Sequence, residues 1–424
     1  MPDPRLTIVD AGQAIAGARR LRAAERLLRA DPEELRAIQN ERFQTIMQAA
    51  LRTVPYQRLY AFTEWHGGID DLGDLPLLDR EYLASFPLEE RQSETSPEMV
   101  GFSSSGSSGT PLRMAWSKEE DSTRRLLMVR QWRAQGLPNQ DPFVIDFSGR
   151  RSIIGIVING RTVDMSVVNS PTQLADAVRS ARATMLAGDP SLLVEVAEAL
   201  VRYPLQGLVT GGEVLDPQTR SLLEDCFGVP PRDYYGSREG GPIAWECPTG
   251  DGYHVNADAV VVEVLDDAGD PVPDGTDGEV VITNLWNRTC PIVRYRTSDI
   301  AALLPGECRC DVRFPLVGQV QGRRNDWIVA PDGRRVSPMR MLLYPLMGWE
   351  PRMHVTQYKV VQRSIDDFLV QVRWMDGRRE DLVERIRPFY EAVLEASVNV
   401  EVQDVDVMPR SRSGKFRVVE SYVS

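Results

Sequence analysis

Short apolar segments alternate with helical patterns through the middle of this chain, and that alternation constrains its fold more than any other feature. Residues 143–147, 153–158 and 205–210 predict strands, and residues 216–226 predict a helix after the third of them. Strands that alternate with helices are typical of sheets whose faces are covered by those helices. The pattern therefore predicts an α/β fold with mixed sheets.

The sequence pattern changes after residue 322. The patterns that follow are two strands, a helix and a strand, at residues 355–361, 368–374, 379–396 and 398–407. About a hundred residues of this kind are enough for a small domain, and 424 residues exceed what one core usually holds. We expect a large domain over residues 1–322 and a small α+β domain over residues 323–424, with the boundary near Asn325.

Local signals predict further elements on either side of this middle region. Asp31 and Pro32 are typical of a helix start, with a glutamate placed to complete a capping box. Apolar residues then recur at helical spacing and are expected in the core, namely Phe43, Ile46, Met47, Ala50 and Leu51. Residues 260–265 and 279–285 predict strands separated by a turn segment.

Composition limits the classes of function that the chain can serve. A hydrophobic content of 42% with 26% charged residues is typical of a globular protein. A net charge of -12 and a pI near 5.0 argue against nucleic acid and against an anionic membrane as partners. The sequence shows no signal-peptide pattern and no apolar run of membrane-spanning length. Five cysteines in a long chain fit a reducing cytoplasm better than a disulfide framework.

A loop rich in serine and glycine occupies residues 103–111. Glycines let backbone N–H groups turn towards an anion and the hydroxyls add donors, so such a loop can hold phosphates. It is not a Walker loop, because no Gly-Lys-Ser/Thr follows the spacer. A flexible linker is the alternative, but the apolar flanks at 99–102 and 112–116 predict strands and favour a tight loop inside a domain.

Lys415 is one of only three lysines, with Lys118 and Lys359, in a chain that otherwise uses arginine. Lysine offers a compact point charge on a flexible stem, whereas arginine spreads its charge over a planar fork. A solvated surface lysine is the simplest interpretation. The position of Lys415 directly after a Ser-Gly turn indicates instead that a point charge is needed there.

Together the serine loop and Lys415 resemble features of the adenylate-forming superfamily of acyl-CoA ligases and adenylation domains. Three further segments resemble motifs of that superfamily, in the expected order. They are Tyr235-Gly236-Ser237-Arg238-Glu239 (Tyr-Gly-x-Thr-Glu), Tyr295-Arg296-Thr297-Ser298-Asp299 (Tyr-Arg-Thr-Gly-Asp) and Gly322-Arg323-Arg324-Asn325-Asp326 (Gly-Arg-x-Asp-Asp). The short N-terminus, with Val54-Pro55-Tyr56, narrows the resemblance to the phenylacetate–CoA ligase branch. It covers about residues 39–419 and implies a large adenylation domain and a small mobile domain that carries the lysine.

The resemblance also implies a set of ATP-binding residues. The β- and γ-phosphates are expected at Ser104, Ser105, Gly106, Ser107, Ser108, Gly109 and Thr110. Tyr235, Gly236 and Ser237 belong to the nucleotide site, and Gly212 and Glu213 resemble the segment that lines the adenine pocket, although a simple turn is an alternative.

The remaining roles implied by the resemblance concern charge. Glu239 matches the residue that binds Mg²⁺, and the ion would bridge phosphate oxygens. Asp299 matches the residue that binds the ribose hydroxyls, and Arg323 would add donors near the ribose or phosphate. Lys415 would bridge the substrate carboxylate and the α-phosphate.

Three positions depart from the family pattern. Thr110 stands where Lys or Arg is common, and Asn325 replaces an aspartate of the hinge. Arg238 replaces a threonine that contacts the α-phosphate, so it could act on that phosphate as a catalytic cation or read an acidic substrate. We favour the phosphate role for Arg238.

A second constellation offers the soft ligands of a closed tetrahedral zinc site. It consists of Cys247, His254, Cys308 and Cys310. The long insert between the two pairs is unlike a zinc finger, and four unrelated packed residues are the alternative. Some relatives in the phenylacetate–CoA ligase branch carry a structural zinc in this region, so the resemblance favours Zn²⁺.

The resemblance implies a carboxylate ligase that uses ATP and Mg²⁺ to form an acyl-adenylate and then transfers the acyl group to CoA. The expected substrate is a small aryl or arylalkyl acid, and a homodimer is left open. One alternative is transfer to an amine or a carrier-protein thiol, since Thr110, Arg238 and Asn325 leave room for another acceptor. A non-catalytic nucleotide-binding protein is the other alternative, against which Lys415 and Glu239 argue. With three histidines, a Ser-His-Asp triad is not expected.

Overall fold

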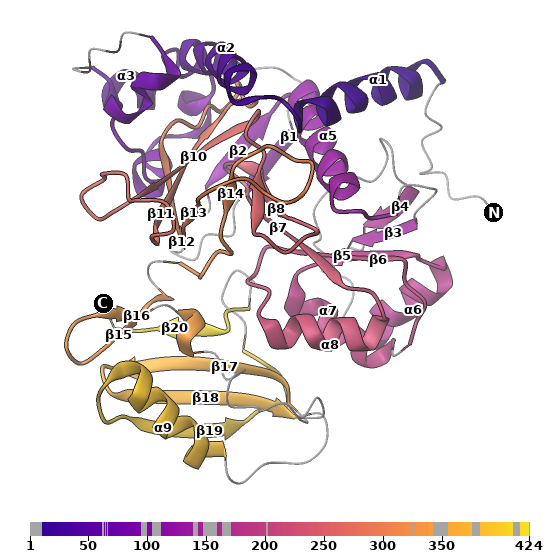
Figure 1. The fold of residues 1–424 in the computed structure, drawn as a ribbon, viewed down its shortest axis with the longest axis vertical. Helices are drawn as coiled ribbons and strands as arrows, with labels where there is room; N and C mark the ends of the chain where they lie inside the picture. Colours follow the sequence, from indigo (N-terminus) through magenta and orange to yellow (C-terminus); the bar gives the residue numbers. More distant parts are fainter. Residues whose placement is uncertain are drawn as a thin grey trace.

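A computed structural model describes most of the chain and shows a mixed α/β fold (Figure 1). The described residues are 11–61, 63, 65, 67–94, 100–103, 112–138, 143–146, 159–162, 171–200, 202–323, 326–336, 338–341, 355–374, 382–409 and 416–423. The described helices are α1 (Ala11–Leu27), α2 (Pro32–Ala50), α3 (Val54–Leu59), α4 (Arg80–Ala84), α5 (Lys118–Ala134), α6 (Pro171–Ala181), α7 (Pro190–Ala199), α8 (Pro217–Phe227) and α9 (Leu382–Leu394), with 3-10 helices η1 (Ile69–Asp74), η2 (Leu88–Arg91) and η4 (Pro338–Met341).

The largest sheet has the strand order β13-β14-β9-β8-β7-β6-β5-β3-β4. Its strands are β3 (Phe143–Asp146), β4 (Asn159–Thr162), β5 (Met185–Gly188), β6 (Gly207–Gly211), β7 (Pro231–Ser237), β8 (Gly241–Glu246), β9 (Tyr253–Val255), β13 (Leu303–Leu304) and β14 (Leu316–Val317). Neighbouring strands are parallel from β7 to β4 and antiparallel from β7 to β13. Helices α6, α7 and α8 bury one apolar cluster with β5 and β6, which matches the alternating pattern in the sequence.

Smaller sheets complete the architecture. They are the pair β1 (Val100–Ser103) and β2 (Arg113–Trp116), the antiparallel sheet β10 (Val260–Leu265), β11 (Gly278–Asn284) and β12 (Tyr295–Ala301), the pair β15 (Ile328–Val329) and β16 (Arg335–Val336), and the sheet β19 (Asn399–Asp404), β18 (Asp367–Trp374), β17 (Val355–Ser364) and β20 (Val419–Ser421). In Figure 1 this last sheet and α9 lie below the rest of the molecule, and they bury an apolar cluster of their own.

Most local predictions agree with these bounds. Asp31 caps α2 by accepting a hydrogen bond from the Glu34 N–H at 2.8 Å, and Pro32 opens the helix. Four of the five predicted core residues of α2 are buried, but Leu51 is 42% exposed. The prediction for Leu51 was wrong because the helix ends at Ala50 and Leu51 is its C-cap. The predicted strand at 153–158 lies outside the described residues.

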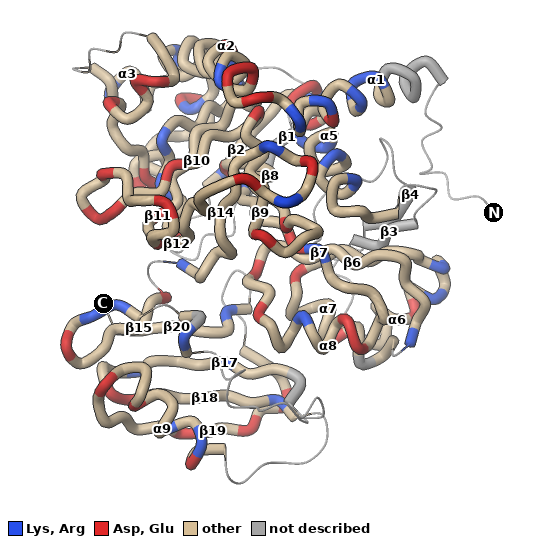
Figure 2. The backbone as a smooth tube through the Cα atoms, in the orientation of Figure 1, with Lys and Arg blue, Asp and Glu red and all other residues tan. Residues whose placement is uncertain are grey.

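Charged residues of both signs are distributed along the described part of the chain. Figure 2 shows Lys and Arg interspersed with Asp and Glu along the helices and loops of the visible face. Among the described helices, not one combines the length and the apolar character needed to cross a membrane.

Candidate functional site

A cavity of about 880 Å³ lies between the large sheet and the C-terminal sheet. The predicted nucleotide-site residues that the structure describes all line it: Gly212, Glu213, Tyr235, Gly236, Ser237, Arg238, Glu239, Asp299 and Arg323. From the C-terminal side it is lined by Gln357 and Tyr358 of β17 and by the segment 416–422. The structure therefore brings three separate motifs to one cavity.

Tyr235, Asp299 and Arg323 form a connected group in this cavity. The Tyr235 hydroxyl donates to Asp299 Oδ2 at 2.7 Å, and Arg323 Nε lies 3.6 Å from Asp299 Oδ1. Burial, together with the Asp299 charge, raises the pKa of Tyr235 well above its ordinary value, so the phenol stays protonated and donates. An isolated antiparallel bridge between residues 299 and 323 holds the two backbones together. The carboxylate is thus held at the cavity wall between two donors.

Glu239 has a cationic partner that the sequence did not reveal. Its Oε1 lies 3.0 Å from Nη1 of Arg80, and both side chains are largely buried. Arg80 is the first residue of α4, and Asp79 caps that helix by accepting from the Tyr82 N–H. No local sequence pattern marks this pairing, because Arg80 and Glu239 lie 159 positions apart. The predicted Mg²⁺ ligand is therefore already paired with a guanidinium.

Asp233 is a second cavity residue that sequence reasoning missed. The hydroxyls of Thr210 and Tyr253 donate to its two oxygens at 2.7 and 2.8 Å. Burial raises the pKa of Asp233 to about 7. Asp233 lies two residues before Tyr235 on β7, so strand periodicity places both on one face; that spacing is the signal that was available.

Gly212 and Glu213 follow β6 directly and line the cavity. Gly212 has φ 89°, in the left-handed region that favours glycine. The Glu213 carboxylate accepts hydrogen bonds from the Ser191 N–H at 3.2 Å and the Phe416 N–H at 2.7 Å. This side chain therefore contacts the C-terminal segment as well as lining the cavity.

Two predicted parts of the site lie outside the described residues. These are Lys415 and the serine loop residues Ser104, Ser105, Gly106, Ser107, Ser108, Gly109 and Thr110. The flanks of the loop are described: β1 and β2 pair in antiparallel register, with Ser103 opposite Arg113. The loop therefore connects two paired strands, as its apolar flanks predicted.

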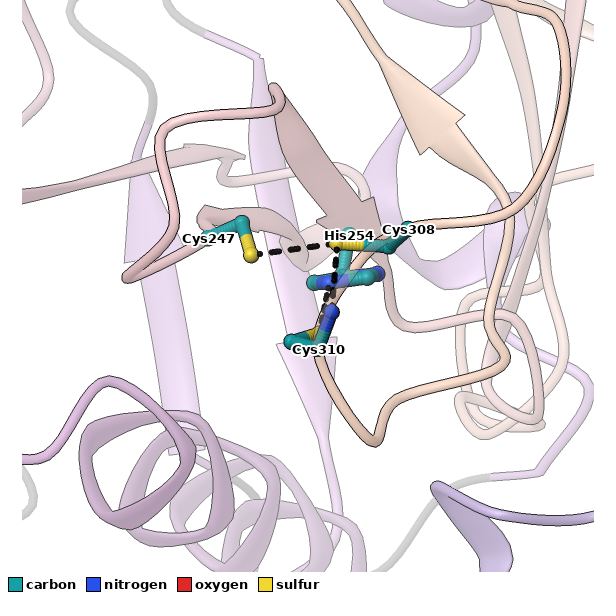
Figure 3. Close-up of side chains that lie close together, drawn as sticks. All are labelled: Cys247, His254, Cys308 and Cys310. Atoms are coloured by element: carbon teal, nitrogen blue, oxygen red, sulfur yellow. Dashed lines mark hydrogen bonds between the residues drawn. The ribbon is translucent and has the colours of Figure 1, made fainter.

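Cys247, His254, Cys308 and Cys310 come together in the structure (Figure 3). Strand β9, which carries His254, pairs with β8 on one side and with β14 on the other. Cys247 follows β8, and the other two cysteines lie between β13 and β14. Gly252 has φ 133° in the turn between β8 and β9, and a Cβ there would lie 2.6 Å from Leu304 Cδ1. Strand pairing and this turn therefore bring distant segments together.

The four residues place their ligand atoms close enough together to hold one metal ion. Their ligand atoms all lie within 4.8 Å of one another, with 3.4 Å between the sulfurs of Cys247 and Cys308 and 3.1 Å between His254 Nε2 and the Cys310 sulfur. Metal–ligand lengths of about 2.0–2.3 Å require separations of about 3.3–3.8 Å. His254 Nδ1 lies 3.1 Å from the Phe314 carbonyl oxygen, which directs the lone pair of Nε2 to the sulfurs. Burial lowers the pKa of His254, which favours the neutral, metal-binding imidazole.

Comparison with known proteins places these features in context. Residues 93–287 match the family model described as AMP-binding enzyme. The phenylacetate–coenzyme A ligase of Escherichia coli (strain K12) is 24% identical over 423 residues, which cover 92% of this chain and 96% of that ligase.

Solved structures share the fold. A 2-hydroxyisobutyryl–CoA ligase in the postadenylation state, 18% identical, gives a TM-score of 0.76 with 92% of this chain and 90% of that chain covered. The same ligase in the thioesterification state gives a TM-score of 0.60, with 93% and 91% covered.

Proposed function

Because the chain belongs to the adenylate-forming family of AMP-binding enzymes and is phenylacetate–CoA ligase-like, we propose that it is an acid–CoA ligase. In the first half-reaction a carboxylate oxygen attacks the α-phosphorus of ATP, the bond to pyrophosphate breaks, and acyl-AMP forms. In the second, the CoA thiol attacks the acyl carbon, loses its proton, and AMP leaves. The product is an acyl-CoA thioester.

The observation that carries this proposal is the convergence of three motifs on one cavity. Asp299, held between Tyr235 and Arg323, presents a carboxylate that can accept hydrogen bonds from the ribose hydroxyls. We assign Gly212, Gly236 and Ser237 to the walls of the same nucleotide site. The cavity volume is in the range of sites for ligands of this size.

Negative charge accumulates on the attacking oxygen and on the departing pyrophosphate, so the reaction needs positioned cations and donors. We assign the β- and γ-phosphates to the loop from Ser104 to Thr110 and the α-phosphate to Arg238 and Lys415. Glu239 would hold Mg²⁺, with Arg80 as the partner that orients its carboxylate. When bound, the metal ion supplies positive charge to the phosphate oxygens.

We also propose that residues 323–424 form a lid domain that moves about a hinge near Asn325. Its sheet buries a separate apolar cluster with α9. The cavity lies between this sheet and the large one, so movement of the lid would open it. The lid would carry Lys415 to the reacting atoms in one pose and withdraw it in the other.

A structural Zn²⁺ is the group that best suits the Cys247, His254, Cys308 and Cys310 cluster. Three sulfurs and one nitrogen at these separations match zinc chemistry, and four protein ligands leave no open position for water or substrate. We propose that the ion ties the β8–β9 turn to the segment between β13 and β14. Its contribution would be to folding free energy and not to the chemical step.

The proposed acid is a small aryl or arylalkyl carboxylate, and the proposed acceptor is CoA. Both follow the names of the relatives, several of which are phenylacetate–coenzyme A ligases. An ATP–pyrophosphate exchange assay over a panel of aryl, arylalkyl and short aliphatic acids tests the first assignment. Adding CoA, an amine or a carrier-protein thiol to the acid that supports exchange tests the second. Absence of exchange with every acid, in protein that binds ATP, would contradict the proposed function.

A further inference from the structure

We infer that Glu213 is a positioning residue that holds the C-terminal segment against the large sheet while adenylation takes place, an inference that rests on the proposed function. Its Oε1 accepts a hydrogen bond from the Phe416 N–H at 2.7 Å, between residues 203 positions apart in the chain. Phe416 directly follows Lys415 in the sequence. The bond therefore fixes the backbone next to the lysine that is assigned to the reacting atoms.

The local structure prepares Glu213 for this contact. Its other oxygen, Oε2, accepts from the Ser191 N–H at 3.2 Å, in the first turn of α7. The N-cap residue of that helix, Asp189, makes no side-chain cap hydrogen bond, so the Glu213 carboxylate satisfies a donor that Asp189 leaves. A negative charge is favoured at this end of a helix. With one oxygen fixed by the helix, the other can form a charge-assisted bond to Phe416.

A second contact joins the same two regions. Gln357 on β17 is 7% exposed, and its Nε2 donates to the Ser191 carbonyl oxygen at 3.0 Å. Ser191 therefore uses its N–H on Glu213 and its carbonyl on the C-terminal sheet. A glutamate that only capped α7 would not need the Phe416 bond, and one that only lined an adenine pocket would need neither.

The two half-reactions should depend on this contact in different ways. If the lid moves between adenylation and thioester formation, the Glu213–Phe416 bond exists in the first pose and must break for the second. The structure is more similar to the postadenylation state of the 2-hydroxyisobutyryl–CoA ligase than to its thioesterification state, with TM-scores of 0.76 and 0.60. Loss of the carboxylate should therefore slow adenylation and spare acyl transfer.

The test compares Glu213→Ala and Glu213→Gln with Glu224→Ala, a control that removes an exposed carboxylate on α8. Hydrogen exchange of the peptide containing the Phe416 amide reports the contact itself. Pyrophosphate exchange and thioester formation from supplied acyl-AMP report the two half-reactions. In Glu213→Ala we expect the Phe416 amide to exchange about tenfold faster and the kcat of adenylation to fall about tenfold. The KM for ATP should stay nearly constant, and the rate of acyl transfer should not change. Glu213→Gln keeps one oxygen and should be intermediate, and Glu224→Ala should resemble wild type.

Three results would overturn the inference: unchanged protection of the Phe416 amide in Glu213→Ala, a higher KM for ATP with normal kcat, or equal loss of both half-reactions. The second would make Glu213 a nucleotide contact instead. Failure of the proposed function has a different signature. Wild-type protein would then show no pyrophosphate exchange, while the Phe416 amide would still lose protection in Glu213→Ala.

Discussion

The cysteine–histidine cluster and the cavity between the two sheets are assembled in different ways. The cluster joins two turns of one sheet, and both turns are fixed by strand pairing around β9. The cavity is formed between two sheets, and the described contacts that join its sides include single hydrogen bonds, such as those of Glu213 with Phe416 and of Gln357 with Ser191. The first arrangement suits a site that must not move. The second suits a site that opens and closes, as the proposed movement of the lid requires.

The largest effect should come from the cavity side of this comparison, in Lys415→Ala. Loss of one charge-stabilising donor should slow adenylation by about a hundredfold or more, while ATP binding, folding and transfer from supplied acyl-AMP change much less. The measurements are pyrophosphate exchange, ATP binding and thioester formation. Lys118→Ala, which removes the lysine at the start of α5, is the matched control. Wild-type exchange in the Lys415 variant, or equal loss in both half-reactions, would contradict the assignment.

The cluster should instead respond in stability. If the four residues share an ion, protein purified without added metal should contain about one zinc per chain. Cys308→Ser, or strong chelation, should lower Tm by about 5–15 °C, because metal-binding energy is also folding energy. Protein that stays folded should keep its kinetics. Cys226→Ser, which changes a half-buried cysteine outside the cluster, should leave zinc content and Tm unchanged. Metal-free protein of full stability would show that the cluster is ordinary packing.

Loss of a contact with bound ATP should have a smaller effect than loss of Lys415, and it should change KM more than kcat. Asp299→Ala removes the carboxylate assigned to the ribose hydroxyls, so KM for ATP should rise about ten- to a hundredfold, as for loss of a charged hydrogen-bond partner. The kcat at saturating ATP should fall less. Initial rates over a range of ATP concentrations separate the two constants. Asp274→Ala, in the exposed turn between β10 and β11, serves as control. A normal KM for ATP would remove Asp299 from the ribose site.

The same two sites show what a sequence can and cannot predict here. Residue types alone indicate possible metal ligands, so His254 and the three cysteines could be chosen as candidates from the sequence. Their proximity could not be predicted, because it depends on the pairing of His254 with Leu316 between two strands. The motifs around Tyr235 and Asp299 could be recognised in order along the chain. The Arg80–Glu239 pair could not, because it spans 159 residues and leaves no local pattern. Leu51 was misplaced by helical spacing alone, since its exposure depends on where α2 ends.

The smallest expected effect concerns Glu239, for which the structure offers two interpretations. If Glu239 binds Mg²⁺, the Glu239→Gln variant should need a few-fold more Mg²⁺ for half-maximal adenylation, because a hard cation prefers a charged oxygen. Nucleotide binding should be nearly unchanged. If Glu239 is only the partner of Arg80, the Glu239→Gln variant should have a lower Tm and an unchanged Mg²⁺ requirement, because breaking a largely buried ion pair destabilises the fold.

Arg80→Gln separates these outcomes, because it breaks the same pair and keeps the carboxylate. Mg²⁺ titrations and thermal melts of both variants are the measurement. A shift of the Mg²⁺ requirement that is larger in Glu239→Gln than in Arg80→Gln assigns the ion to Glu239, because Arg80→Gln removes only the partner that orients the carboxylate. Equal loss of Tm with unchanged titrations would give Glu239 a structural role, as is proposed for the cysteine–histidine cluster.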